Sequence, residues 1–182
     1  MKVISGKYKG RKLEGFNIIG TRPTMDRVKE SLFGTIQNYL ENSTILDLFS
    51  GSGNLAIESL SQNASFAYLV DSNIKAIKVI NNNIKNIQID NTKVLHMDYK
   101  KALLYFKDSN IKFDIIFLDP PYNTNYIEQS IKLVTEYNLL EDNGIIVCES
   151  NSIDKIIYSD TYKEIKSKKY GDKYIVLLEK IW

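Results

Sequence analysis

Five short runs rich in β-branched and aromatic residues alternate along the chain with segments whose apolar residues recur every three or four positions. The runs are TILDLF (44–49), FAYLV (66–70), TKVLHM (92–97), FDIIFL (113–118) and GIIVCE (144–149). Because these runs are apolar throughout, they are typical of strands buried on both faces, and their alternation with helices predicts a parallel sheet. The last stretch, residues 161–182, instead predicts two strands joined by a hairpin turn at Gly171–Asp172.

The first 40 residues precede this pattern and form a different kind of segment. Gly6 and Gly10 flank a basic stretch in KVISGKYKGRKL, which favours a short β-hairpin. A helix is predicted to follow within residues 21–40, with Thr24 as its N-cap. We therefore expect a basic N-terminal extension, residues 1–40, packed on an α/β core formed by residues 41–182, within one compact domain.

Positive charge is concentrated near the N-terminus. Residues 1–30 hold eight basic and three acidic side chains, a net charge of +5, whereas the whole chain carries only +2. A basic segment on a near-neutral body indicates a polyanionic partner, although a solvated basic face would look the same in sequence. The candidate phosphate contacts are Lys7, Lys9, Arg11, Lys12 and Arg22.

Each of the first four predicted strands has an acidic residue near its end or directly after it. These residues are Asp47, Asp71, Asp98 and Asp119. Since the carboxyl ends of parallel strands meet at one edge of a sheet, the four carboxylates are expected along one rim, where ligands bind. Gly51 and Gly53, in DLFSGSG, let the backbone turn sharply and approach a ligand before the next helix. Asp71 is then placed to accept hydrogen bonds from the two hydroxyls of a ribose.

The glycine turn by itself fits two cofactors. Gly51, Gly53 and Ala56 also satisfy the nicotinamide-dinucleotide pattern G-x-G-x-x-G/A, with Asp71 at the expected distance. Three features argue against a dehydrogenase: the acid before the glycines, Asp98 after the third strand, and the sequence DPPY (119–122), for which hydride transfer has no use.

The order of these motifs resembles that of the S-adenosylmethionine-dependent amino-methyltransferases. More narrowly, five stretches are similar to the RsmD-type methyltransferases, which modify guanine N2 in bacterial 16S ribosomal RNA. These stretches are ISGKYKGRKL, TRPTMDRVKESLF, LDLFSGSGNLAIESLS, FLDPPY and YGDKYIVLLEK. The similarity covers nearly the whole chain and implies a Rossmann-like class I methyltransferase fold with a seven-stranded, mostly parallel sheet. Asp71 departs from the family, which more often has Glu there.

The resemblance implies S-adenosylmethionine as the cofactor and ribosomal RNA, within a small-subunit particle or naked, as the partner. The residues expected at the cofactor are Asp47, Gly51, Gly53, Asp71, Asp98 and Tyr99. Tyr99 either packs near the adenine or only begins the next helix, and the sequence leaves both open. No metal is required, because the sulfonium already makes the methyl group electrophilic.

The sequence DPPY suits the methylation of a nucleobase amine, whose lone pair is delocalised into the ring. Asp119 and the carbonyl oxygen of Pro120 can each accept a hydrogen bond from one N–H group of this amine. The doubled proline fixes φ at both positions. Tyr122 offers a flat face for stacking a base, worth roughly 1–3 kcal/mol. The catalytic candidates are therefore Asp119, Pro120 and Tyr122. Taken alone, the motif also fits a stiff turn after a strand.

Three functional hypotheses stay open. The first is a guanine-N2 ribosomal RNA methyltransferase, the second an enzyme with the same chemistry on adenine N6 of DNA or RNA, and the third a non-catalytic RNA-binding relative. The polar start of the chain and its lack of a long apolar run predict a cytoplasmic protein without a membrane segment. The lone cysteine, Cys148, fits a reducing compartment. We expect a monomer.

Overall fold

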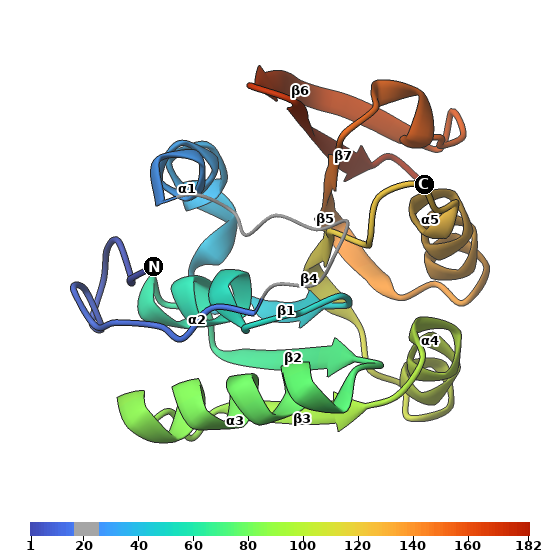
Figure 1. Ribbon diagram of the computed structural model, residues 1–182. Coiled ribbons are helices and arrows are strands. Elements are labelled where there is room, and N and C mark those ends of the chain that lie inside the picture. The colour runs from blue at the N-terminus through green and yellow to red at the C-terminus, as the bar shows by residue number, and fades with distance from the viewer. Residues whose placement is uncertain (17–25) are drawn as a thin grey trace.

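A seven-stranded sheet forms the centre of the molecule (Figure 1). The computed structural model describes residues 1–16 and 26–182. The strands are β1 (Thr44–Asp47), β2 (Phe66–Asp71), β3 (Thr92–His96), β4 (Phe113–Leu118), β5 (Leu140–Ser150), β6 (Tyr162–Tyr170) and β7 (Lys173–Lys180). Their order in the sheet is β3-β2-β1-β4-β5-β7-β6, and only β6 and β7 are antiparallel to their neighbours. The predicted α/β fold, with a mostly parallel sheet and a C-terminal hairpin, is confirmed.

In the described part of the chain, five α-helices cover the two faces of the sheet. They are α1 (Asp26–Leu40), α2 (Asn54–Ser61), α3 (Ile74–Ile87), α4 (Tyr99–Asp108) and α5 (Tyr126–Glu136), and a short 3₁₀ turn, η1 (Ile153–Lys155), follows β5. Apolar residues of α1, α2 and α3 pack in one core with alternate residues of the strands. Residues of α4 and α5 pack in the second core, on the other face. Among the described residues, no helix has the length and apolarity needed to cross a membrane.

The strand order places a topological switch point between β1 and β4. From β1 the chain continues to β2 and β3 on one side, whereas β4 and β5 lie on the other side of β1. The loops after β1 and β4 therefore diverge, which leaves a crevice at the carboxyl ends of these two strands. This is the edge at which the sequence places DLFSGSG and DPPY.

The structure refines two local predictions. The N-terminal hairpin is short: one antiparallel bridge joins Lys2 and Lys12, and the backbone amides of Val3 and Leu13 donate to the carbonyls of Arg11 and Met1. The backbone amides of Ile4 and Ser5 donate to the side chain of Glu58 in α2, so the pairing does not extend further. Strand β5 begins at Leu140, four residues before the predicted run, because Leu140 pairs with Phe113 across a register shift. Thr24, the predicted N-cap, lies outside the described residues.

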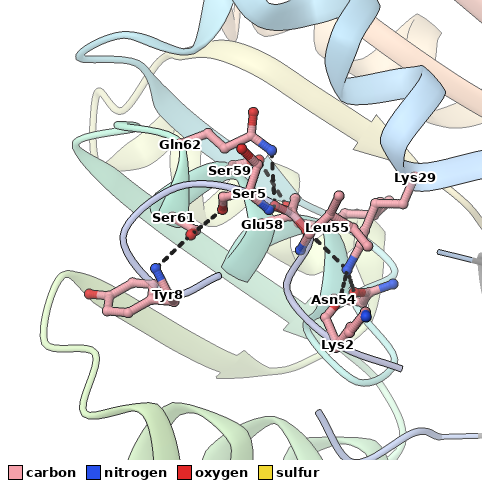
Figure 2. A network of polar contacts seen from close by, with 11 residues as sticks. Lys2, Ser5, Tyr8, Lys29, Asn54, Leu55, Glu58, Ser59, Ser61 and Gln62 are labelled. Carbon is pink, nitrogen blue, oxygen red and sulfur yellow. Dashed lines mark hydrogen bonds and ion pairs between the residues drawn. The ribbon is translucent and has the colours of Figure 1, made fainter. Parts of the chain in front are cut away.

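A buried ion pair attaches the N-terminal segment to the core (Figure 2). The ammonium of Lys29 in α1 lies 3.1 Å from Glu58 Oε1 in α2, and both side chains are fully buried. Lys29 also donates to the carbonyl oxygen of Lys2 and to Asn54 Oδ1, each at 2.6 Å. Glu58 accepts the amides of Ile4 at 2.8 Å and Ser5 at 3.2 Å. One pair of charges therefore connects two helices and the N-terminal segment.

The end of α2 holds the same segment a second time. Lys7 donates its backbone amide to the carbonyl of Ser61, and Tyr8 donates its amide to Ser61 Oγ, both at 2.9 Å. Gly6 adopts a left-handed φ of +86°, and a Cβ atom there would lie 1.8 Å from the carbonyl oxygen of Ser61. Only glycine lets the backbone approach the helix end this closely.

Glu58→Ala is expected to lower the free energy of unfolding by about 3–5 kcal/mol, because it leaves the Lys29 ammonium buried without its counter-charge. It also removes the acceptor of two backbone amides. Urea unfolding measures the loss. The matched control is Glu128→Ala, which removes the partly exposed partner of the exposed Lys132 in α5 and should cost less than about 1 kcal/mol. Equal costs for the two variants would show that the buried pair does not hold the segment.

Candidate active site

A pocket of about 250 Å³ opens at the carboxyl ends of β1, β2 and β4. Most of the predicted site residues line it: Asp47, Gly51, Asp71, Asp98, Tyr99, Asp119, Pro120 and Tyr122. Gly53 lies directly behind this wall, as the N-cap of α2. Residues that are far apart in the sequence thus meet in one cavity, as the predicted parallel sheet requires.

Two glycines shape the turn after β1. Gly51 and Gly53 have φ of +60° and +82°, in the left-handed region that side chains disfavour. A Cβ atom on Gly53 would come within 3.1 Å of Leu69 Cδ2, whereas nothing lies within 4 Å of a Cβ on Gly51. Gly53 is therefore required for packing of the turn on β2, and Gly51 leaves the backbone open on the cavity side.

Asp71 holds this turn with one carboxylate oxygen. Its Oδ2 accepts the backbone amide of Gly51 at 2.9 Å, and its Oδ1 accepts that of Asn73 at 2.9 Å. Each oxygen keeps a second lone pair, so two further donors from a ligand can be bound. Burial raises the pKa of Asp71, and the amides of Asn73 and Gly51 oppose this rise because they stabilise the charged form.

Asp47 is the most buried of the predicted acids, with 1% of its surface exposed. Its carboxylate accepts a hydrogen bond of 3.0 Å from Ser50 Oγ. The pKa of Asp47 is raised to about 7, mainly by burial; the hydroxyl of Ser50 and the amide of Ala56 oppose this rise, and the charge of Asp71 adds to it. An acid with this pKa changes its charge near neutral pH, which is uncommon outside functional sites.

An aromatic cluster forms another wall of the pocket. Phe49 stacks on Tyr126 with ring centroids 6.0 Å apart, and Tyr99 lies 4.7 Å from Tyr126. The Tyr99 hydroxyl donates to Gln129 Oε1 at 2.5 Å, and burial followed by the charge of Asp98 raises the pKa of Tyr99 to about 12. Asp98 is exposed and also caps α4 by accepting the amide of Lys100 at 2.9 Å. A planar ligand has a stacking surface here.

The turn after β4 is stiffened beyond its two prolines. Thr124 donates its hydroxyl to the carbonyl of Pro121 at 2.9 Å, and Asn123 adopts a left-handed φ of +62°. Asp119 and Tyr122 are partly exposed at the pocket. Burial is the largest cause that raises the pKa of Asp119 well above its ordinary value, and burial also raises the pKa of Tyr122.

The candidate phosphate contacts lie away from this pocket. Lys7, Lys9 and Arg11 are exposed in a turn bound to Ser61, at the far end of α2, and Arg11 donates to the carbonyl of Asn86, at the end of α3. Both helices begin at the pocket edge, so this turn lies at the opposite end of the sheet. Lys12 is exposed beside the bridge to Lys2. Arg22 lies outside the described residues.

Sequence reasoning missed several residues of the site. Phe49 and Tyr126 line the pocket, and each could have been found because it directly flanks a predicted strand end or helix start. Met1 and Phe16 reach it from the N-terminal segment, for which no sequence pattern gave a signal. Asn83, buried in α3, donates to the carbonyls of Ser52 and Glu14 and so links the glycine turn to that segment.

Within residues 1–16 and 26–182, no group of three histidine, cysteine or carboxylate side chains is placed to bind a metal ion.

Comparisons with known proteins find relatives over most of the chain. The family profile described as conserved hypothetical protein 95 matches residues 1–179. A candidate rRNA methyltransferase of Bacillus subtilis is 41% identical over 150 residues, 82% of each chain. The ribosomal RNA small subunit methyltransferase D of Haemophilus influenzae is 34% identical, with 94% of this chain and 89% of that protein covered. Among solved structures, a candidate methyltransferase from Escherichia coli superposes with a TM-score of 0.86 at 27% identity, covering 99% and 97% of the chains.

Asp47→Asn is expected to stabilise the unliganded protein at pH 8, by up to about 4 kcal/mol. The folded-state pKa of Asp47 lies above its unfolded value, so folding stability is lost as the pH rises from about 4 to about 7. The neutral amide avoids this loss and can still accept from Ser50. Urea unfolding should therefore show a gain at pH 8 that exceeds the gain at pH 5 by about 2 kcal/mol. Asp160→Asn, at an exposed position, is the control, and a pH-independent effect at Asp47 would contradict the expectation.

Proposed function

The chain belongs to the family described as conserved hypothetical protein 95, which includes the ribosomal RNA small subunit methyltransferase D proteins, and we propose that it methylates the exocyclic N2 amine of a guanine in small-subunit ribosomal RNA. S-adenosylmethionine is the proposed methyl donor. The observation that carries the proposal is the position of DPPY: Asp119, Pro120 and Tyr122 border the same cavity as the glycine turn and Asp71.

The residues of the pocket fit the chemical groups of this cofactor. Asp71 keeps free lone pairs for the two ribose hydroxyls, and the backbone at Gly51 is open to close approach. Phe49, Tyr99 and Tyr126 offer ring faces to the adenine. Asp47 and Asp98 supply acceptors for its polar groups, with Asp47 near the strand end from which the turn begins. When bound, S-adenosylmethionine supplies a methyl group on a positively charged sulfur.

Asp119 and Pro120 act on the amine. The Asp119 carboxylate and the Pro120 carbonyl each accept a hydrogen bond from one N–H group of the amine. These two hydrogen bonds hold the nitrogen with its lone pair directed at the methyl group. The two prolines fix the backbone angle φ, and this keeps the Pro120 carbonyl in one direction. Proline has no backbone N–H, so no hydrogen bond from these residues contributes to that direction. Holding reactants in line in this way can account for a large part of an enzymatic rate enhancement.

Tyr122 receives the base. Its ring is half-buried at the pocket, and stacking of a base on such a ring is worth roughly 1–3 kcal/mol. This offsets part of the few kcal/mol needed to pull the base from its helix. The burial that raises the pKa of Tyr122 keeps its hydroxyl neutral at physiological pH.

The RNA contacts are proposed for Lys7, Lys9, Arg11, Lys12 and Arg22. Lys7 and Lys9 stand at the far end of α2, eight residues or about 12 Å from the pocket edge. An RNA substrate must therefore extend along the N-terminal segment while its target base occupies the pocket. A folded ribosomal RNA, free or within a small-subunit particle, is large enough to do so. Binding through phosphates should weaken as the salt concentration rises.

The substrate assignment is tested by mass spectrometry of nucleosides from small-subunit ribosomal RNA. RNA from cells that lack the gene is compared with RNA from the same cells complemented by it. Loss and recovery of N2-methylguanosine is expected. Recovery of N6-methyladenosine instead would support the alternative amine target, and no change in any methylated nucleoside would favour a non-catalytic RNA-binding protein.

Asp119→Ala is expected to reduce methyl transfer from labelled S-adenosylmethionine by at least about 100-fold, because the amine loses a transition-state acceptor. Its affinity for S-adenosylmethionine, measured by calorimetry, should remain near that of the wild type. Asp71→Ala is the matched contrast: it should weaken cofactor binding about tenfold or more, since it removes both ribose acceptors. Near wild-type turnover in Asp119→Ala would rule out the acceptor role, and unchanged affinity in Asp71→Ala would remove that residue from the ribose site.

A further inference from the structure

One face of the sheet carries an ionisable side chain at the same end of five adjacent strands. Within each strand, alternate residues point to opposite faces, and the residues packed on α1, α2 and α3 include Leu69, Ile45, Phe117, Val147 and Ile175. Two positions further toward the pocket edge, the same face presents Asp71, Asp47, Asp119, Glu149 and Lys173. The row follows the strand order β2-β1-β4-β5-β7.

The last two members of this row form a buried ion pair. Lys173 Nζ lies 2.6 Å from Glu149 Oε1, and the side chains of Lys173 and Glu149 are only 7% and 3% exposed. The pair joins the terminal hairpin to β5. Cys148 pairs with Leu118 across the β5–β4 ladder, so Glu149 and Asp119 are the next residues on neighbouring strands. Lys173 and Glu149 thus stand beside the proposed amine acceptor.

The charges of the pair act on Asp119 in opposite directions. Burial is the largest cause that raises the pKa of Asp119; the negative charges of Glu149 and Asp47 raise it further, and the positive charge of Lys173 lowers it. For Lys173 itself, burial works to lower the pKa, but the charge of Glu149 and its hydrogen bond, followed by Asp119, outweigh this and raise it. Lys173 therefore keeps its proton and its charge at neutral pH.

We propose that Lys173 and Glu149 are positioning residues: as a buried ion pair beside Asp119, they set the charge that the Asp119 carboxyl group carries at neutral pH. Lys173 offsets the negative charge of the acidic side chains on three neighbouring strands. Asp119 can therefore be an ionised carboxylate and accept a hydrogen bond from an N–H group of the amine. Glu149 fixes the direction of the ammonium. The role in catalysis rests on the proposed function, whereas control of the Asp119 charge does not.

The charged groups around Asp119 come from several elements. They are Asp47 on β1, Glu149 on β5 and Lys173 on β7. Tyr122 lies in the same turn as Asp119 and is itself acted on by Lys173, Glu149, Asp119 and, from the hairpin turn, Asp172. Among the charges that act on Asp119, Lys173 is the positive one that opposes the acids. Its placement is not explained by stability alone, because buried ion pairs are often replaceable by apolar pairs at no cost.

The test follows the titration of Asp119 in the full-length protein by carbon-13 carboxyl NMR, with the resonance assigned through Asp119→Asn. In Lys173→Met the midpoint should move to higher pH, because the compensating positive charge is lost. In Glu149→Gln it should move to lower pH, because a repelling charge is lost and the ammonium remains. The low-pH limb of the kcat/KM profile should move in the same directions. At pH 7, Lys173→Met should lose about tenfold or more in kcat/KM and recover as the pH rises.

Lys180→Met is the matched control. Lys180 is a second buried lysine on β7 and donates to the carbonyl of Leu140 at 2.9 Å, at the end of the strand opposite the pocket. Its loss should lower thermal stability without moving the midpoint or the pH profile. If Lys173→Met does not fold, Glu149→Gln, which keeps an acceptor for the ammonium, decides the matter.

The outcomes are distinct for the two claims. Midpoints that stay unchanged, or that move in the same direction in both variants, would overturn the inference and leave the pair a merely structural one. Midpoints that move as expected in a protein without methyl transfer would support control of the Asp119 charge and contradict the proposed function. Moved midpoints with an unmoved kcat/KM profile would overturn the catalytic role of the pair.

Discussion

The carboxylate of Glu58 is the contact on which the assembly of the pocket depends. It pairs with Lys29 of α1 in the protein interior and accepts two partly buried amides of the N-terminal segment. Met1 and Phe16, which lie in this segment, form part of the pocket wall. Asn83 adds a second connection, between Glu14 and Ser52 in the glycine turn. The wall and the turn are therefore held by the same buried polar contacts, and a loose segment would open the site.

At the pocket edge, in contrast to Glu58, acidic side chains lie close to other negative charges. Glu58 is paired and accepts several donors, whereas Asp47 and Asp119 are acids whose pKa is raised by burial and by neighbouring negative charges. The cause is the geometry of the sheet: side chains alternate with a period of two, so Asp47, Asp71 and Asp119, each two residues beyond a residue of the first core, point to the same face at the same edge. Folding gains nothing from this arrangement, and the Lys173–Glu149 pair only partly compensates it. Such local conflict is expected where side chains serve a ligand instead of the core.

Much of the fold and of the pocket could be predicted because the decisive residues are local in sequence. The strand runs, the hairpin turn and the acids at the strand ends need only periodicity and parallel pairing. The Glu149–Lys173 pair could not be found that way. Glu149 ends an apolar run and Lys173 begins another strand 24 residues later, and their contact exists only because β7 pairs antiparallel with β5. The short extent of the N-terminal hairpin could not be predicted either, because a side chain from a distant helix takes the two amides that a longer ladder would use.

Burial also determines which of the positively charged side chains act at the surface of the protein. Lys29 counts among the basic N-terminal residues of the sequence, yet it is fully buried and neutralised by Glu58, so it contributes little to the field outside the protein. Four lysines of the edge strand β6, by contrast, are exposed: Lys163, Lys166, Lys168 and Lys169. Lysines on an edge strand discourage pairing with another chain, and β6 also runs toward the pocket edge, where it turns into Lys173. Exposed positive charge therefore occurs on β6, beside the pocket edge, as well as on the N-terminal segment at the opposite end of the sheet.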